Sequence, residues 1–177
     1  MFLIRKSLIV VALVISGTFS ALTNATEEYR LSAFADVLGY AQIKANDVIE
    51  AKDFMATKIK KKPDFLELNN FCVLGVLVED FSAAIESCEA AIEMSAQSRE
   101  LGFSSKKKAL ASIHSNLAIA KALSGDLEGA EYELEVALTL NSRDTNVKIN
   151  IEWLETSNLI ASLYVSMFLK GVWKVVF

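Results

Sequence analysis

Apolar residues in the second half of the chain recur at intervals of three or four, a spacing typical of amphipathic helices. Ala130 and Leu134 follow the turn residue Asp126 at steps of four. Further on, Val147, Ile151 and Leu154 fall on one face of another predicted helix. Glycine and proline are scarce, with 7 and 1 residues among 177, which also favours helices over a sheet.

One order of residues occurs three times along the chain. A large apolar residue is followed by a smaller one, then by a turn ending in Asp, an Ala four residues later, and a larger residue after four more. The paired residues are Leu38-Gly39, Phe71-Cys72 and Leu117-Ala118, and the later positions are Asp47, Ala51 and Met55, then Asp80, Ala84 and Cys88, then Asp126, Ala130 and Leu134. The repetition predicts helical hairpins in which the Asp caps the second helix and the small residues let the helices approach closely.

The copies are unevenly spaced. Ala51 and Ala84 are 33 residues apart, whereas Ala84 and Ala130 are 46 apart. The extra residues lie near Gly102, which predicts a turn between two longer helices, and Pro63 can begin the second hairpin because it cannot continue a preceding helix. We therefore expect hairpins at about 31–64, 65–98 and 109–142, and a capping helix at 144–156 that begins at Asp144 or Thr145.

These copies resemble the tetratricopeptide repeat family over roughly residues 31–142. The third copy, NLAIAKALSGDLEGAEYELEVALTLNS, matches best. The second departs most, with Cys72 where Gly or Ala is usual and Gly75 where tyrosine is common, and no copy has the family's tryptophan. The chain resembles the exported bacterial members of this family. This resemblance implies an all-α, right-handed α-solenoid of about three hairpins plus a capping helix.

The resemblance also implies a concave groove, lined by the first helix of each hairpin, that binds an extended or helical peptide. The groove-facing residues would be Asp36, Tyr40, Lys44, Asn69, Asn70, Asn116 and Ile119. Asn70 and Asn116 occupy equivalent places, where related proteins often use asparagine to bond a peptide's backbone. Cys72 and Cys88 would face each other within one hairpin, so that a disulfide and a pair of small buried side chains are both open.

The first 25 residues have the order of a secretory signal. Arg5 and Lys6 precede an apolar run, and Thr23-Asn24-Ala25 supplies small residues for cleavage. We expect a periplasmic or secreted mature chain that begins at Thr26; the alternative is a retained anchor in the inner membrane. Removal of 1–25 takes the formal net charge from −4 to −6, because the segment holds two basic residues and no acidic one. A chain this acidic is a poor partner for nucleic acid.

The C-terminal segment 157–177 is apolar and unlike the repeats. Only Lys170 and Lys174 are charged in it, and an exposed tail of this composition would promote aggregation. It is too short and interrupted to predict a membrane-spanning helix. Three interpretations are open for 159–177: it folds back onto the groove or the stack end, it contacts a second copy or a partner, or it lies on a membrane with Trp173 at the headgroups.

No residue pattern suggests catalysis, a cofactor or a metal. The single histidine, His114, lacks partners at ligand spacing and is expected to be packed or half-exposed. Glutamates on the predicted second helices are spaced like a solvated outer face (Glu86, Glu89, Glu128, Glu131, Glu133 and Glu135). Together with the export signal, the resemblance implies a non-enzymatic periplasmic scaffold or adaptor that binds a partner peptide. The alternative is a membrane-associated assembly factor of an envelope or pilus complex that uses the apolar C-terminus.

Overall fold

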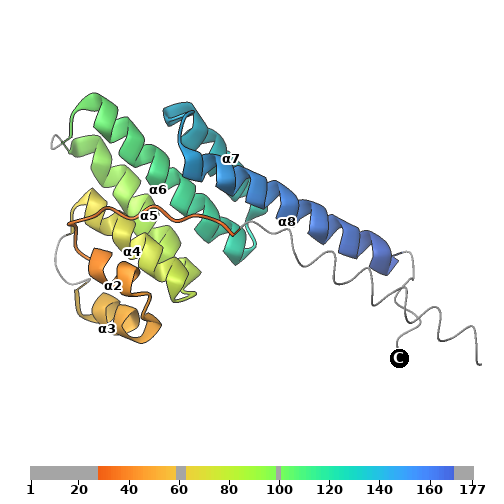
Figure 1. The fold of residues 1–177 in the computed structure, drawn as a ribbon, viewed down its shortest axis with the longest axis horizontal. Helices are drawn as coiled ribbons and strands as arrows, with labels where there is room; N and C mark the ends of the chain where they lie inside the picture. The colour runs from red at the N-terminus through yellow and green to blue at the C-terminus, as the bar shows by residue number, and fades with distance from the viewer. Residues whose placement is uncertain (1–27, 59–62, 99–100, 170–177) are drawn as a thin grey trace, which may run out of the picture.

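The protein is all-α. The computed structural model describes residues 28–58, 63–98 and 101–169, and within these ranges it has seven helices and no strand. The helices are α2 (Tyr40–Ala45), α3 (Val48–Lys58), α4 (Phe65–Leu77), α5 (Phe81–Gln97), α6 (Phe103–Ser124), α7 (Leu127–Leu140) and α8 (Thr145–Leu169). From α4 to α7 each helix packs against the next, and α8 packs against both α6 and α7 (Figure 1).

The main core lies between α4, α5 and α6. Phe65, Ile113 and Leu117 are almost fully buried in it. The α4 and α5 helices approach closely at Gly75, where an added Cβ would lie 2.9 Å from the Cα, Cβ and N atoms of Ala84. A tyrosine at this position, as is common in the family that the sequence resembles, would therefore require the two helices to separate.

The expected helix caps and crossing residues are confirmed. The Asp47, Asp80 and Asp126 side chains accept hydrogen bonds from backbone N–H groups two or three residues later. The alanines that follow them by four, at 51, 84 and 130, are buried at the helix contacts. These features explain why the sequence forms α3, α5 and α7 where it does.

The irregular spacing of the copies also has the expected cause. The α5 helix has 17 residues and α6 has 22, and Gly102 is the residue before α6. Pro63 precedes the α4 N-cap Asp64, which forms a capping box with Glu67. The long α6 helix spans the width of the core and contacts α4, α5, α7 and α8.

The N-terminal part differs from the expected first hairpin at 31–64. Its first helix is reduced to the six residues of α2, and the residues before it are not helical. We call Glu28–Leu38 the strap: it is irregular to Phe34, turns over 35–38, and joins α2 through Gly39, whose φ is +91°. Figure 1 shows the strap crossing α4 and α6 and ending beside α8.

The predicted capping helix is longer than 144–156. Asp144 begins α8 by accepting from the Asn146 and Val147 N–H groups, and α8 continues to Leu169, past the other helices (Figure 1). Residues 157–169 therefore continue α8, and the interpretation in which they fold back over the groove is wrong for this part. Residues 170–177, like the expected signal segment 1–25, lie outside the described residues.

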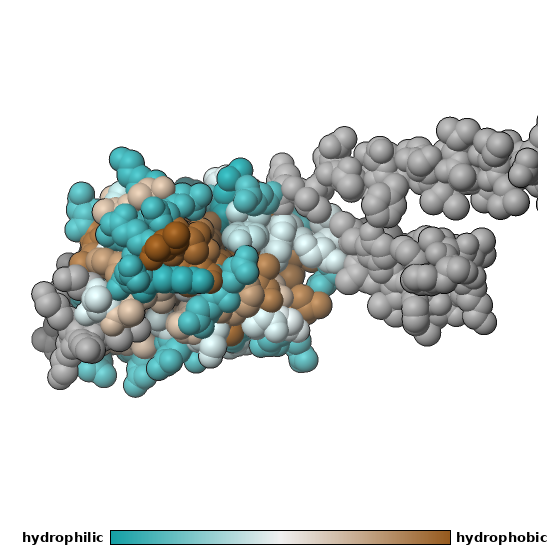
Figure 2. Space-filling model, turned by 90° about the horizontal axis from the view of Figure 1, so that it is seen from below, coloured by the Kyte–Doolittle hydropathy of each residue, from teal (hydrophilic) through white to brown (hydrophobic). Residues whose placement is uncertain are grey.

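Some apolar side chains are exposed to solvent at the end of the molecule formed by α2 and α3. Val48 and Ile49, at the start of α3, are 41% and 78% exposed. Figure 2, which looks from the α3 side, shows apolar atoms gathered among hydrophilic ones. This end is therefore less enclosed than the α4–α6 core.

Candidate peptide-binding groove

Three asparagines hold the strap by its backbone. The Arg30 N–H donates to Asn150 Oδ1 at 2.7 Å, and Asn150 Nδ2 donates to the Arg30 carbonyl at 2.8 Å. Asn116 makes the same pair with Ser32, at 2.9 and 2.8 Å. Asn70 makes it with Phe34, at 2.8 and 3.0 Å. We call these residues the asparagine ladder.

The ladder matches the geometry of an extended chain. In such a chain the N–H and C=O of one residue point to the same side, and this side alternates from residue to residue. A carboxamide presents one acceptor and one donor side by side, so it can satisfy both groups of one residue. The ladder accordingly binds residues 30, 32 and 34, and its members come from α8, α6 and α4. The strap runs from α8 to α4, against the order of these helices in the chain.

The ladder is fully buried and is connected to further polar residues. Asn116 Nδ2 donates to Asn69 Oδ1 at 2.8 Å, and Asn69 Nδ2 donates to the Ser32 carbonyl at 2.9 Å. Asn146 Nδ2 donates to Ser32 Oγ at 3.0 Å. Asn69, Asn70, Asn116 and Asn150 all have 0% exposure, so each of these bonds satisfies a group that would be costly to bury alone.

The strap also buries apolar side chains. Tyr29, Leu31 and Phe34 are half-buried and pack against the main core. The Tyr29 ring meets Trp153 of α8 edge to face, with centroids 5.2 Å apart and an interplanar angle of 72°. Arg30 is exposed even though its backbone is bound. The groove thus contacts the strap both through its backbone and through three of its side chains.

The predicted groove residues fall into two sets. Asn69, Asn70 and Asn116 lie in the groove and bond a peptide backbone, which belongs to this chain itself. Ile119, also predicted to face the groove, is fully buried in the core cluster against which the strap side chains Tyr29, Leu31 and Phe34 pack.

The others were placed on a helix that does not form as expected. Asp36 lies in the exposed turn of the strap with φ +60°, so the prediction that it faces the groove from a helix is wrong. Tyr40 and Lys44 lie on the short α2, and within the described residues neither side chain makes a hydrogen bond.

Sequence reasoning missed Asn150, the third member of the ladder. Asn150 follows the cap Asp144 by six residues, as Asn70 follows the cap Asp64, and each asparagine precedes a large apolar residue. This shared spacing could have identified α8 as a third groove helix. The strap itself was also missed, because it was interpreted as the first helix of a hairpin.

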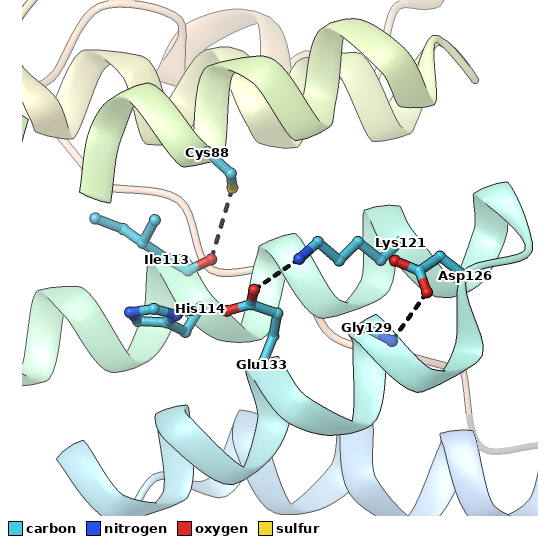
Figure 3. A network of polar contacts seen from close by, with 7 residues as sticks. All are labelled: Cys88, Ile113, His114, Lys121, Asp126, Gly129 and Glu133. Atoms are coloured by element: carbon cyan, nitrogen blue, oxygen red, sulfur yellow. Dashed lines mark hydrogen bonds and ion pairs between the residues drawn. The ribbon is translucent and has the colours of Figure 1, made fainter. Parts of the chain in front are cut away.

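A disulfide fixes one wall of the groove. Cys72 of α4 and Cys88 of α5 are joined, with their Cα atoms 5.2 Å apart and both residues fully buried. Cys72 lies two residues after Asn70, so the bond ties this groove helix to its outer neighbour. Cys88 Sγ lies 3.6 Å from the Ile113 carbonyl oxygen (Figure 3), a packing contact because a disulfide sulfur has no hydrogen to donate.

Glu133 departs from the predicted solvated outer face. It is 6% exposed, and its two oxygens lie 2.7 Å from His114 Nδ1 and 2.7 Å from Lys121 Nζ (Figure 3). Burial alone would raise the pKa of the Glu133 carboxyl, but the hydrogen bonds and charges of His114 and Lys121 outweigh it and hold this pKa below its usual value. The cluster joins α6 to α7, and His114 is half-buried, as expected.

A second concave surface lies between α7 and α8. This cleft of about 280 Å³ is apolar at Leu134, Leu138, Ile151 and Leu154, and its rim carries Glu131, Glu135 and Glu155.

Among the described residues no cluster of three or more His, Cys, Asp and Glu side chains could hold a metal ion. In the same part of the chain, no helix is both long and apolar enough to cross a membrane.

Comparison with known proteins adds no relative: no family model, no curated protein and no solved structure matches this chain.

Proposed function

We propose that this protein is a non-enzymatic, exported scaffold or adaptor that holds an extended segment of a partner protein in its groove. The observation that carries the proposal is the asparagine ladder, which binds both backbone polar groups of three alternate residues. We infer that α4–α8 belong to a right-handed solenoid of the tetratricopeptide type. The capped hairpins and the small residues at their crossings support this inference.

In this proposal the strap is an internal occupant of the groove. Because the ladder bonds only backbone atoms of the strap, its hydrogen bonds can form equally with a partner segment in the same extended conformation. A short tether gives the strap an effective concentration of the order of millimolar. A partner must therefore displace the strap, either by contacting the groove more extensively or by being held nearby in a larger assembly.

The proposed location follows from residues 1–25 and from the disulfide. The charged, apolar and small-residue order of that segment is typical of export. A buried Cys72–Cys88 bond suits an oxidising compartment such as the periplasm.

The test uses the mature chain with a protease site inserted in the exposed turn at Ala35–Asp36. After cleavage, the strap is free to exchange with a fluorescein-labelled peptide of residues 26–36. We expect saturable binding, measured by fluorescence anisotropy, to the cut protein and much weaker binding to the uncut protein, whose tethered strap competes. Asn70→Ala together with Asn116→Ala should abolish binding while helical content is kept. A cut, folded protein that exchanges no peptide would contradict the proposal.

A second candidate function is a membrane-associated assembly factor. The observation that favours it is the continuation of α8 past the other helices, with no charged residue from 159 to 169. Flotation with liposomes of mixed neutral and anionic lipid would test it. Co-flotation of the mature chain that is lost on truncation after Thr156 would support it, and absence of the full chain from the lipid fraction would reject it.

A further inference from the structure

We propose that the groove selects its occupant by side chains as well as by backbone, and that the strap has the sequence pattern that a partner segment must match. The pattern is an aromatic residue at position 29, leucine or a similar residue at 31, a small hydroxyl residue at 32 and an aromatic residue at 34. This inference rests on the proposed function and specifies its ligand: an aromatic-flanked segment, uncharged at position 32, that runs from α8 to α4.

The aromatic requirement comes from the two ends of the bound segment. Tyr29 packs edge to face on Trp153 of α8, and Phe34 packs against the main core beside its bonds to Asn70. Leu31 packs against the same core between them. The asparagine ladder fixes residues 30, 32 and 34, so it sets the register in which these three side chains meet the groove.

The requirement for a small hydroxyl residue comes from Ser32. Its N–H donates to Asn116, its carbonyl accepts from Asn69, and its Oγ accepts from Asn146. The side chains around it are neutral amides, and Asn69 and Asn116 are fully buried. A carboxylate or ammonium group at position 32 would lose part of its hydration, and the groups that hydrogen-bond Ser32 would offer it only neutral amides.

Two positions of the strap contrast with these and supply controls. Arg30 is exposed while its backbone is bound, and Ala35 is exposed in the turn. A partner segment is therefore unrestricted at position 30. The strap, which meets every requirement, excludes segments that meet only some of them, because they must compete with a tethered occupant.

The first experiment measures the affinity of peptides of residues 26–36 for the cut full-length mature chain. We expect Tyr29→Ala and Phe34→Ala peptides to bind about tenfold or more weakly than the native peptide. The Arg30→Ala peptide should bind within about twofold of the native one. If all four peptides bind equally, the groove recognises backbone alone and this inference is overturned, while the proposed function stands. If the native peptide also fails to bind, the proposed function fails.

The second experiment needs no cut and tests the same contacts in the intact mature chain. Amide exchange of the Ser32 N–H reports opening of the strap. Tyr29→Ala and Phe34→Ala should speed this exchange about tenfold or more relative to Arg30→Ala. Equal exchange in the three variants would show that the side chains do not hold the strap, and would overturn the inference even if the cut protein unfolds.

Discussion

The most informative single change is Asn116→Ala, at the centre of the asparagine ladder. Asn116 is fully buried and makes three hydrogen bonds, two with the Ser32 backbone and one with Asn69 Oδ1. After truncation the Ser32 carbonyl keeps its bond from Asn69, but the Ser32 N–H and Asn69 Oδ1 lose their partners. Each of these two groups left unsatisfied costs about 1–3 kcal/mol, so we expect a loss of about 2–6 kcal/mol in the free energy of unfolding.

Urea denaturation of the mature chain, followed by circular dichroism at 222 nm, measures this loss. The control is Asn158→Ala: among the described residues its side chain bonds only the exposed Glu131 carboxylate, and its Oδ1 is buried with no hydrogen-bond partner there. We expect the control to change the unfolding free energy by no more than about 0.5 kcal/mol. If Asn116→Ala is as mild as its control, the buried bonds to the strap do not exist in solution and the groove described here is wrong.

Three further predictions follow from other parts of the molecule. Ala130→Leu should overpack the α6–α7 crossing and cost about 1–3 kcal/mol, visible as a lower melting temperature; an unchanged value would mean that the repeat register is wrong. Burial alone would raise the pKa of the Glu133 carboxyl, but His114 and Lys121 lower this pKa overall. The carboxylate therefore stabilises the fold fully above the usual glutamate pKa of about 4.3. This contribution is lost as pH falls through the lower pKa of the folded state. Glu133→Gln should flatten the dependence of stability on pH in that acid range, and an identical pH profile would exclude the cluster as its source. Truncation after Thr156 should leave the protein folded, because it keeps Val147, Asn150 and Leu154, the buried residues among the α8 side chains that the structure describes; loss of most of the helical signal would show that the apolar tail is core.

The helical part of the fold could be predicted because its causes are local. Asp80 and Asp126 cap helices that begin at the next residue, and Ala84 and Ala130 lie one turn later at the crossings. The equivalence of Asn70 and Asn116 likewise follows from their repeat positions. Such features depend on residues close together in sequence, where spacing alone carries the information.

The strap could not be predicted in this way, because the groups that determine its conformation are distant. Its backbone is bound by asparagines that are 36, 84 and 120 residues away in sequence. Its apolar and alanine residues fit an amphipathic helix equally well, and only the ladder decides for the extended form. The prediction that Glu133 lies on the solvated face was wrong for a similar reason. Its spacing in the sequence indicates an outer face, whereas its burial depends on its contacts with His114 and Lys121 on α6.

The most direct test of the central claim is amide hydrogen exchange along the strap of the intact mature chain, resolved residue by residue by NMR. The ladder binds the N–H groups of Arg30, Ser32 and Phe34, whereas those of Leu31 and Ala33 make no hydrogen bond within the described residues. We predict protection that alternates with a period of two, strong at 30, 32 and 34 and weak at 31 and 33. Uniformly fast exchange would show that the strap does not occupy the groove, and continuous protection from 29 to 38 would show that it is helical; either result would contradict the account.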